Sequence, residues 1–206
     1  DDPAHAGAEA PDLCPVCGAA ADRFEAFADR PHAAGGGEFT GRLVVVGAGI
    51  AGISAIEAFR NTTSGGTATL VSREPDLPYY RLNLTRYLAG EIPETDLPIH
   101  PESWFADQKV DLKLGADVAE IRLEEQCICL RDNTTLPYDK LIVTMGAHPF
   151  MPPIPGAARE GMISVRTVRD AKWILDFLTP GMRCVGIGGG LLGLETAGAL
   201  AARKAD

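Results

Sequence analysis

A short apolar run followed at once by three spaced glycines constrains this chain more than any other feature. Residues 43–46 read LVVV, a run suited to a strand buried on both faces, and glycines follow at GxGxxG spacing. The first glycine permits a tight turn, the second lets the backbone approach a pyrophosphate, and the third lets a helix pack closely on the strand. The pattern predicts a dinucleotide site at a helix N-terminus, with a tight turn that holds no ligand as the alternative. The predicted cofactor-binding residues are Gly47, Gly49, Ile50, Ala51 and Gly52.

A second copy of the same pattern occupies residues 183–200. An apolar run is again followed by Gly188, Gly190 and Gly193, and then by a stretch rich in Leu and Ala that reads as a helix. Two such units imply two dinucleotides. We therefore expect a flavin and a nicotinamide that pass a hydride between them.

The overall charge limits the partners that the chain can attract. The formal net charge is −9 and no Lys/Arg-rich run stands out, so we expect no nucleic acid or anionic membrane as partner. No apolar stretch is long enough for a membrane span, and the first residues do not resemble a signal peptide. A cytoplasmic location is the default expectation. The five cysteines then favour metal binding or reduced thiols over a disulfide framework.

Residues 1–32 differ in kind from the rest and carry one metal knuckle. Cys14 and Cys17 lie in a CPxCG turn, whose spacing lets both thiolates face one ion. The segment resembles the second half of a rubredoxin-like domain, and the first CxxCG half is absent from this sequence. An iron site, a zinc-filled or dimer-bridged site, and an empty knuckle therefore remain as alternatives. A Gly-rich linker is expected at residues 33–38.

The ribose of the first dinucleotide needs an acidic partner near the end of the second strand, which is expected at residues 68–72. An acid about 20 residues beyond the glycines commonly holds the ribose hydroxyls. That distance from Gly52 falls on Ser72, and the nearest acid is Glu74. Both are candidates. A solvated loop glutamate is the alternative for Glu74.

The segment at residues 78–86, PYYRLNLTR, resembles the PYxRPPLSK signature of FAD-dependent pyridine nucleotide oxidoreductases. This group includes rubredoxin reductases, ferredoxin reductases and the flavin part of assimilatory nitrite reductase. The resemblance places Arg81 towards the FAD pyrophosphate and Arg86, which replaces a lysine, towards the isoalloxazine. A guanidinium keeps the charge but donates no proton near neutral pH. Two surface arginines before a helix are the alternative.

A second signature lies at residues 138–146, where YDKLIVTMG resembles the YDxLxxATG motif of the same family. It predicts a buried strand whose end, with Thr144 and Gly146, passes near the cofactor. The resemblance also places the Val118 backbone at the adenine and Glu195 close to nicotinamide and flavin. A carboxylate favoured by the helix dipole is the alternative for Glu195.

The resemblance implies an α/β fold with two Rossmann-like parts. The FAD-binding domain is expected at residues 39–152, and residues 153–206 form the start of an inserted NAD(P)-binding domain that the chain leaves incomplete. We expect an amphipathic helix within residues 164–178 to pack against the second glycine unit. Further strands are expected near residues 111–114 and 118–123, and a turn at residues 133–136.

The spacing of cysteines favours electron transfer without thiol chemistry. No cysteine occurs between Cys17 and Cys127, where related disulfide reductases carry a redox pair. Cys127 and Cys129 share one strand face and are read as packing residues, with a metal site as the alternative. The leading hypothesis is an NAD(P)H oxidoreductase that reduces a one-electron acceptor protein or a tethered rubredoxin-like domain. The alternatives are a non-catalytic FAD-binding subunit that needs a complementary chain or a second copy, and a metal-knuckle adaptor.

Overall fold

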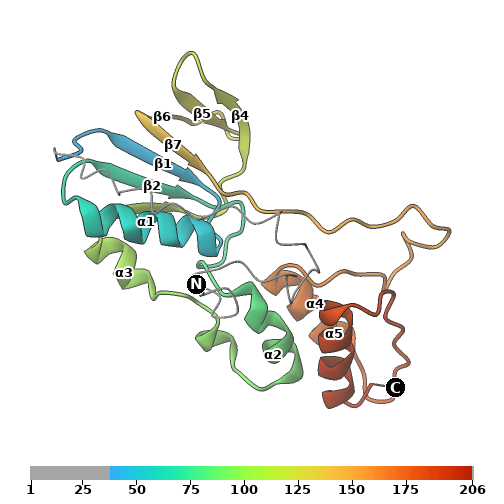
Figure 1. The fold of residues 1–206 in the computed structure, drawn as a ribbon. Coiled ribbons are helices and arrows are strands. Elements are labelled where there is room, and N and C mark those ends of the chain that lie inside the picture. Colours follow the sequence, from blue (N-terminus) through green and yellow to red (C-terminus); the bar gives the residue numbers. More distant parts are fainter. Residues whose placement is uncertain (1–37, 206) are drawn as a thin grey trace, which may run out of the picture. The chain divides into compact units, whose positions relative to one another are not determined.

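The computed structural model describes residues 38–205, which belong to one compact unit (Figure 1). Its centre is a sheet of four parallel strands in the order β3-β2-β1-β7. They are β1 (Arg42–Val46), β2 (Thr67–Val71), β3 (Val110–Lys113) and β7 (Lys140–Val143). The predicted α/β class with a parallel sheet is confirmed.

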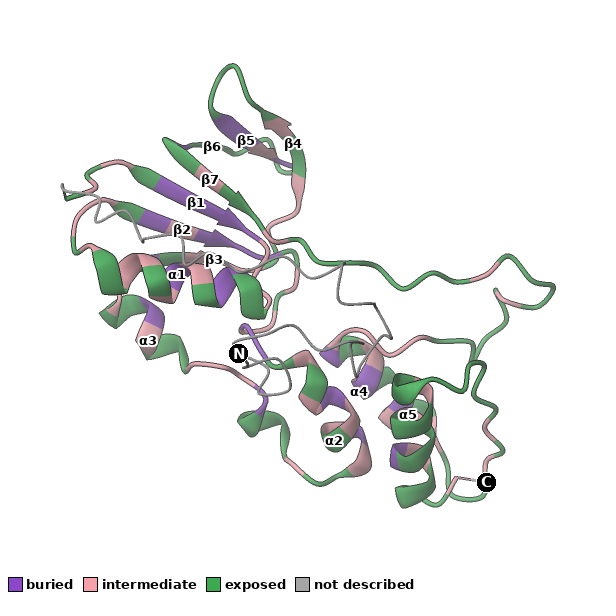
Figure 2. Cartoon of the chain, viewed as in Figure 1, coloured by how far each residue is buried: buried purple, intermediate pink, exposed green. Residues whose placement is uncertain are grey.

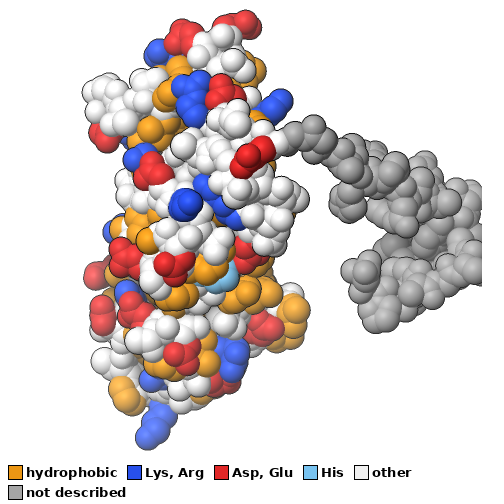
Figure 3. All heavy atoms as spheres, turned by 90° about the vertical axis from the view of Figure 1, so that its left-hand side faces the viewer, with side chains coloured by type: hydrophobic (Ala, Val, Ile, Leu, Met, Phe, Trp, Pro, Cys, Tyr) orange, Lys and Arg blue, Asp and Glu red, His pale blue; other side chains and the backbone are white. Residues whose placement is uncertain are grey.

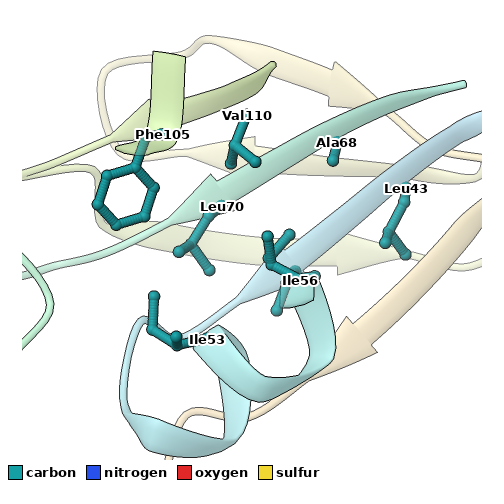
Figure 4. Packing of buried hydrophobic residues seen from close by; sticks show 8 residues of the cluster. Leu43, Ile53, Ile56, Ala68, Leu70, Phe105 and Val110 are labelled. Atoms are coloured by element: carbon teal, nitrogen blue, oxygen red, sulfur yellow. The ribbon is translucent and has the colours of Figure 1, made fainter. Parts of the chain in front are cut away.

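One face of the sheet is covered by α1 (Ile50–Thr62) and α3 (Glu102–Asp107). Ile53 and Ile56 are fully buried and lie over Leu43 of β1 and Leu70 of β2 (Figure 4). Phe105 from α3 closes the same cluster. The helical spacing of the apolar residues in α1 therefore builds this side of the core, as the sequence predicts.

The other face is covered by an antiparallel meander, β4 (Val118–Arg122), β5 (Cys127–Leu130) and β6 (Thr135–Pro137). Ile128 and Leu130 pack against Val44 and Val46 of β1. Side chains alternate between the two faces of a strand, so β1 supplies Leu43 and Val45 to one layer and valines to the other. This is why its sequence is apolar without interruption.

A second cluster of helices consists of α2 (Leu84–Ala89), α4 (Val168–Phe177) and α5 (Leu191–Ala202). Leu88 of α2 is fully buried between Ile174 of α4 and Ala199 of α5. Arg203 follows α5, and its Nε donates a hydrogen bond of 2.8 Å to the Leu88 carbonyl. The amphipathic helix predicted within residues 164–178 forms as α4, but it does not pack directly against the second glycine unit as expected, because α2 lies between α4 and α5.

Two short 3₁₀ turns complete the regular structure. They are η3 (Arg81–Asn83) and η4 (Glu94–Asp96). Residues 144–167 contain neither helix nor strand and are largely exposed (Figure 2).

The strand predicted before the second glycine unit is wrong. Residues 183–187 are not in a strand, and the exposed fractions of Val185 and Ile187 are 88% and 70%. A β-strand needs a hydrogen-bonded neighbour, and no other strand among residues 38–205 lies beside this run. The apolar pattern of a strand is therefore present, but the described residues provide no neighbouring strand to which it could hydrogen-bond.

Two further expectations need correction. The turn expected at residues 133–136 is shorter, because Thr135 and Leu136 already pair with β5 as part of β6. The strand expected to be buried at residues 138–146 is β7, which lies at the edge of the sheet, and Val143 is 47% exposed. An edge strand has a neighbour on one side only, which explains why its apolar residues are not fully covered.

The surface carries mixed charge. Acidic and basic side chains are interspersed with apolar ones over the face shown in Figure 3. None of the helices in residues 38–205 combines the length and the apolar character that a membrane span requires.

An exposed ion pair ties β1 to the start of β7 and predicts a pH effect. The Nη2 of Arg42 lies 3.0 Å from Oδ1 of Asp139, and the Arg42 backbone N–H donates to Oδ2 at 2.6 Å. The side-chain and backbone hydrogen bonds from Arg42 lower the pKa of Asp139 to about 2. A lowered carboxyl pKa stabilises the fold at higher pH, and this contribution is lost as the pH falls from about 4 to about 2.

We therefore expect Asp139→Asn to reduce the loss of stability over this pH range. The measurement is chemical denaturation at several pH values between 2 and 5 (roughly the range of carboxyl titration). Asp107→Asn is the control, since the Asp107 carboxylate forms no ion pair within residues 38–205. Equal pH profiles for wild type and Asp139→Asn would contradict the prediction.

Candidate nucleotide-binding site

The first glycine loop joins β1 to α1 and is held closed by backbone contacts. Gly47 has φ +106°, a conformation that side chains disfavour, and its N–H donates to the Val71 carbonyl at 2.9 Å. A Cβ on Gly52 would collide with the Gly47 carbonyl. Thr144, after β7, donates from Oγ1 to the carbonyls of Gly47 at 2.8 Å and Val46 at 3.1 Å. The structure thus brings the predicted residues Thr144, Gly47 and Gly52 together.

Gly49 has a different role from the other two glycines. Its φ of −76° suits any residue, and a Cβ built on it would meet no protein atom within 4 Å. The first intrahelical bond of α1 runs from Ile53 N–H to the Gly49 carbonyl, so the preceding N–H groups of the helix make no such bond. Ile50 and Ala51 are exposed beside this opening. Open space at a helix N-terminus with free N–H groups fits a diphosphate.

The second glycine loop repeats this geometry before α5. Gly188 has φ +114°, and a Cβ on Gly193 would collide with the Gly188 carbonyl. Gly190 has φ −75° and ψ 175°, close to the values of −76° and −176° at Gly49. A Cβ on Gly190 also meets no protein atom within 4 Å. The turn therefore forms although the preceding strand is absent, and the residues fit a second diphosphate.

The two ribose candidates do not present a free acid to the loop. Ser72 is 7% exposed, its N–H donates to the Lys113 carbonyl at 2.8 Å, and its carbonyl accepts from Ala116. The Glu74 carboxylate is instead bound by Arg81 and by the Tyr79 hydroxyl, the latter at 2.5 Å. The role of both residues at a ribose stays a prediction.

A polar cluster that sequence reasoning missed surrounds the Tyr79 hydroxyl. Arg81 donates from Nη1 to this oxygen and to the Arg166 carbonyl, each at 2.9 Å. The Val168 N–H donates to the same hydroxyl at 3.1 Å. Burial and the hydrogen bond to Glu74 raise the pKa of Tyr79, so the phenol stays neutral at physiological pH. Its place in the PYxR motif was visible in the sequence, but the distant partners were not.

The other predicted site residues are not joined to the first loop by hydrogen bonds or ion pairs within the described part of the chain. Arg86 is exposed on α2 and pairs with Glu91 at 3.2 Å, and Glu195 is exposed on α5. Val118 begins β4 and pairs with Leu130. Gly146 has φ +66° just beyond β7. Their assignment to cofactor contacts or catalysis remains a prediction.

The predicted metal knuckle of Cys14 and Cys17 lies outside the described residues. Within residues 38–205, no group of three or more His, Cys, Asp or Glu side chains is arranged to hold a metal ion. Cys127 is buried and Cys129 half-buried in β5, which agrees with their interpretation as packing residues.

A cavity of about 250 Å³ lies apart from both glycine loops. It is lined by Glu57 and Asn61 of α1 and by Trp104 and Gln108 at α3. His100 stacks on the Trp104 ring, with centroids 4.0 Å apart. No residue predicted to bind a cofactor lines this cavity.

Comparison with known proteins agrees with this geometry. The model of the family described as pyridine nucleotide-disulphide oxidoreductase matches residues 41–206, which include both glycine loops and the cluster around Tyr79. The chain belongs to this family. The resemblance that the two sequence signatures suggest is thereby confirmed. A second family model, that of the rubredoxin-like domain of rubrerythrin, matches residues 4–25.

Several curated proteins match the greater part of this chain. Rhodocoxin reductase of Rhodococcus erythropolis is 36% identical over 163 residues, which are 79% of this chain and 38% of that protein. Rubredoxin-NAD(+) reductase of Pseudomonas putida is 32% identical over 76% of this chain and 41% of that protein. The chain thus spans about two fifths of the length of these relatives.

A solved structure also matches most of this chain over about two fifths of its own length. NADH:rubredoxin oxidoreductase from Clostridium acetobutylicum superposes with a TM-score of 0.70 and 26% identity. The match covers 80% of this chain and 42% of that one.

Proposed function

We propose that the protein is an FAD-dependent NAD(P)H oxidoreductase that passes electrons to a rubredoxin-like or other one-electron acceptor protein. The observation that carries the proposal is the pair of glycine loops with matching geometry, one before α1 and one before α5. The relatives named above are reductases of this kind. Two helix N-termini with open backbone can accept two dinucleotides, as a flavin and a nicotinamide require.

In this proposal, the residues of the chain bind the two dinucleotides and orient them. A bound flavin would supply the redox chemistry, because it takes a hydride from the nicotinamide and releases electrons one at a time. The free N–H groups at Ile50 and Ala51 would hold the FAD diphosphate, and Arg81 would add positive charge. Gly188 and Gly190 would shape the nicotinamide site. Arg86 and Glu195 are the proposed residues at the reacting groups.

The acceptor is proposed to be a small iron protein or a tethered domain of this type. The rubredoxin-like match at residues 4–25, with Cys14 and Cys17 as proposed ligands of iron, supports this. No cysteine lies between Cys17 and Cys127, so the chain offers no thiol pair between the proposed iron ligands and β5 for an intermediate transfer. We propose a cytoplasmic location, since the thiols of Cys127 and Cys129 are free, as reducing compartments favour.

An anaerobic titration tests the proposal. We expect the purified chain to bind FAD, and the flavin absorbance to bleach when NADH or NADPH is added. The Gly190→Asp variant should still bind FAD but fail to bleach, because the new carboxylate repels the nicotinamide diphosphate. A chain that takes up no FAD would overturn the proposal.

A second candidate is a non-catalytic FAD-binding subunit that needs a complementary chain or a second copy. It is favoured by apolar side chains that α5 and the run before it leave exposed. They are Val185, Ile187, Leu191, Leu192 and Leu194. Binding of FAD without bleaching by either nicotinamide would support this candidate over the first.

A further inference from the structure

The Tyr79 hydroxyl joins two parts of the chain that are far apart in sequence, the segment from Glu74 to Arg81 and the start of α4. The side chain is 6% exposed, and its oxygen donates to Glu74 Oε2 at 2.5 Å. The same oxygen accepts from Arg81 Nη1 at 2.9 Å and from the Val168 N–H at 3.1 Å. Every hydrogen-bonding capacity of a phenol is used here.

The backbone around Tyr79 is fixed independently of this oxygen. The Tyr80 N–H donates to the Leu97 carbonyl at 3.3 Å, and the Ile99 N–H donates to the Pro78 carbonyl at 2.8 Å. The ring packs in a cluster with Leu84 of α2 and with Val168 and Ala171 of α4. A phenylalanine would therefore keep the packing and lose only the hydrogen bonds.

Tyr79 supplies the hydrogen-bond acceptor for one of the backbone N–H groups at the N-terminus of α4. Thr167 and Asp170 form a capping box, which satisfies other donors of the first turn. The Val168 N–H is left to the tyrosine oxygen, and the preceding Arg166 carbonyl accepts from Arg81. Arg81, the residue expected at the FAD diphosphate, is thus joined to the segment that begins α4 in two ways, directly at the Arg166 carbonyl and at Val168 through one buried hydroxyl.

We propose that Tyr79 is a positioning residue that fixes the Arg81 guanidinium for the FAD diphosphate and couples it to the N-terminus of α4. The inference rests on the proposed function, since it assumes that the chain binds FAD. Glu74 serves as the counter-charge in this cluster. FAD binding and the docking of α4 are then linked, so that each stabilises the other.

The first test is Tyr79→Phe in the full 206-residue chain. We expect FAD, titrated by quenching of its fluorescence, to bind about tenfold more weakly, because Arg81 and Val168 lose a buried acceptor. Tyr138→Phe is the matched control, since Tyr138 is also 6% exposed and belongs to the cluster beneath the meander. Unchanged affinity in Tyr79→Phe would overturn the proposal.

A double-mutant cycle with Arg81→Ala separates positioning from general packing. If Tyr79 acts through Arg81, adding Tyr79→Phe to Arg81→Ala should change the FAD dissociation constant less than about twofold. A further tenfold loss in the double mutant would show that Tyr79 acts by another route and would overturn the assignment.

Val168→Pro tests the same link from the opposite side. Val168 is the first residue of α4, where proline is tolerated, and Thr167 has an extended conformation with φ −121° and ψ 162°, as a residue before proline requires. The variant removes the N–H and leaves Tyr79 in place. We expect FAD to bind roughly threefold more weakly. Wild-type affinity in both this variant and Tyr79→Phe would refute the coupling.

Hydrogen exchange gives a readout that needs no cofactor. The Val168 amide should exchange about tenfold faster in Tyr79→Phe than in wild type or Tyr138→Phe. In wild type, saturating FAD should slow it further. A wild-type chain that binds no FAD refutes the proposed function, whereas equal Val168 exchange in Tyr79→Phe and wild type refutes the tie to α4.

Discussion

Replacing Gly49 with aspartate is expected to abolish FAD binding while the chain still folds. The new Cβ meets no protein atom within 4 Å, and φ at this position is −76°. Aspartate is also a favoured N-cap residue, so α1 should be as stable as in wild type or more so. The carboxylate would occupy the space left for the diphosphate. Repulsion of about 4 kcal/mol at close range predicts at least a hundredfold weaker binding.

Equilibrium titration with FAD and thermal denaturation of the same samples check this prediction. Gly190→Asp is the matched control, because Gly190 has nearly the same conformation and an equally open Cβ direction in the second loop. It should bind FAD as wild type does. If Gly49→Asp retained FAD, the diphosphate would have to lie elsewhere.

Ile53→Ala is expected to have the largest effect on stability. Ile53 is fully buried between α1 and the sheet, so the change leaves a cavity and should lower the free energy of unfolding by about 3 kcal/mol. Ile50→Ala removes the same atoms from the same helix at a position that is 55% exposed. It should change stability by less than about 0.5 kcal/mol.

Urea denaturation of the cofactor-free chains measures both values. Cofactor is omitted because Ile50 lies beside the proposed diphosphate site, where bound FAD would add its own stabilisation. Similar losses for the two variants would mean that α1 does not pack on the sheet as described.

The parts of the fold that local pattern controls were predictable from the sequence. The buried strand, glycine turn and amphipathic helix of β1 and α1 are each specified by neighbouring residues, and the structure places them as expected. These predictions depended on no contact between distant residues.

The errors and omissions concern interactions between distant segments. Whether residues 183–187 form a strand depends on a neighbour that the pattern of those residues does not encode. The same holds for β7, whose exposure follows from its place at the sheet edge. The partners of the Tyr79 hydroxyl could not all be read from spacing either, because its contact with the Val168 N–H spans 89 positions. The role of Glu74 at a ribose stays a prediction, and the structure adds its contacts with Tyr79 and Arg81.

The contact of Arg203 with the end of α2 has an evolutionary consequence. Gly90 ends α2 with φ +83°, and a Cβ on it would lie 2.9 Å from Nη2 of Arg203. Its left-handed conformation alone would admit asparagine as well as glycine. With the guanidinium in place, asparagine would require the end of the Arg203 side chain to shift, which would disturb its hydrogen bond to the Leu88 carbonyl. Lineages that have replaced this arginine with a small residue should therefore accept asparagine at position 90 more readily, so the two positions are expected to covary.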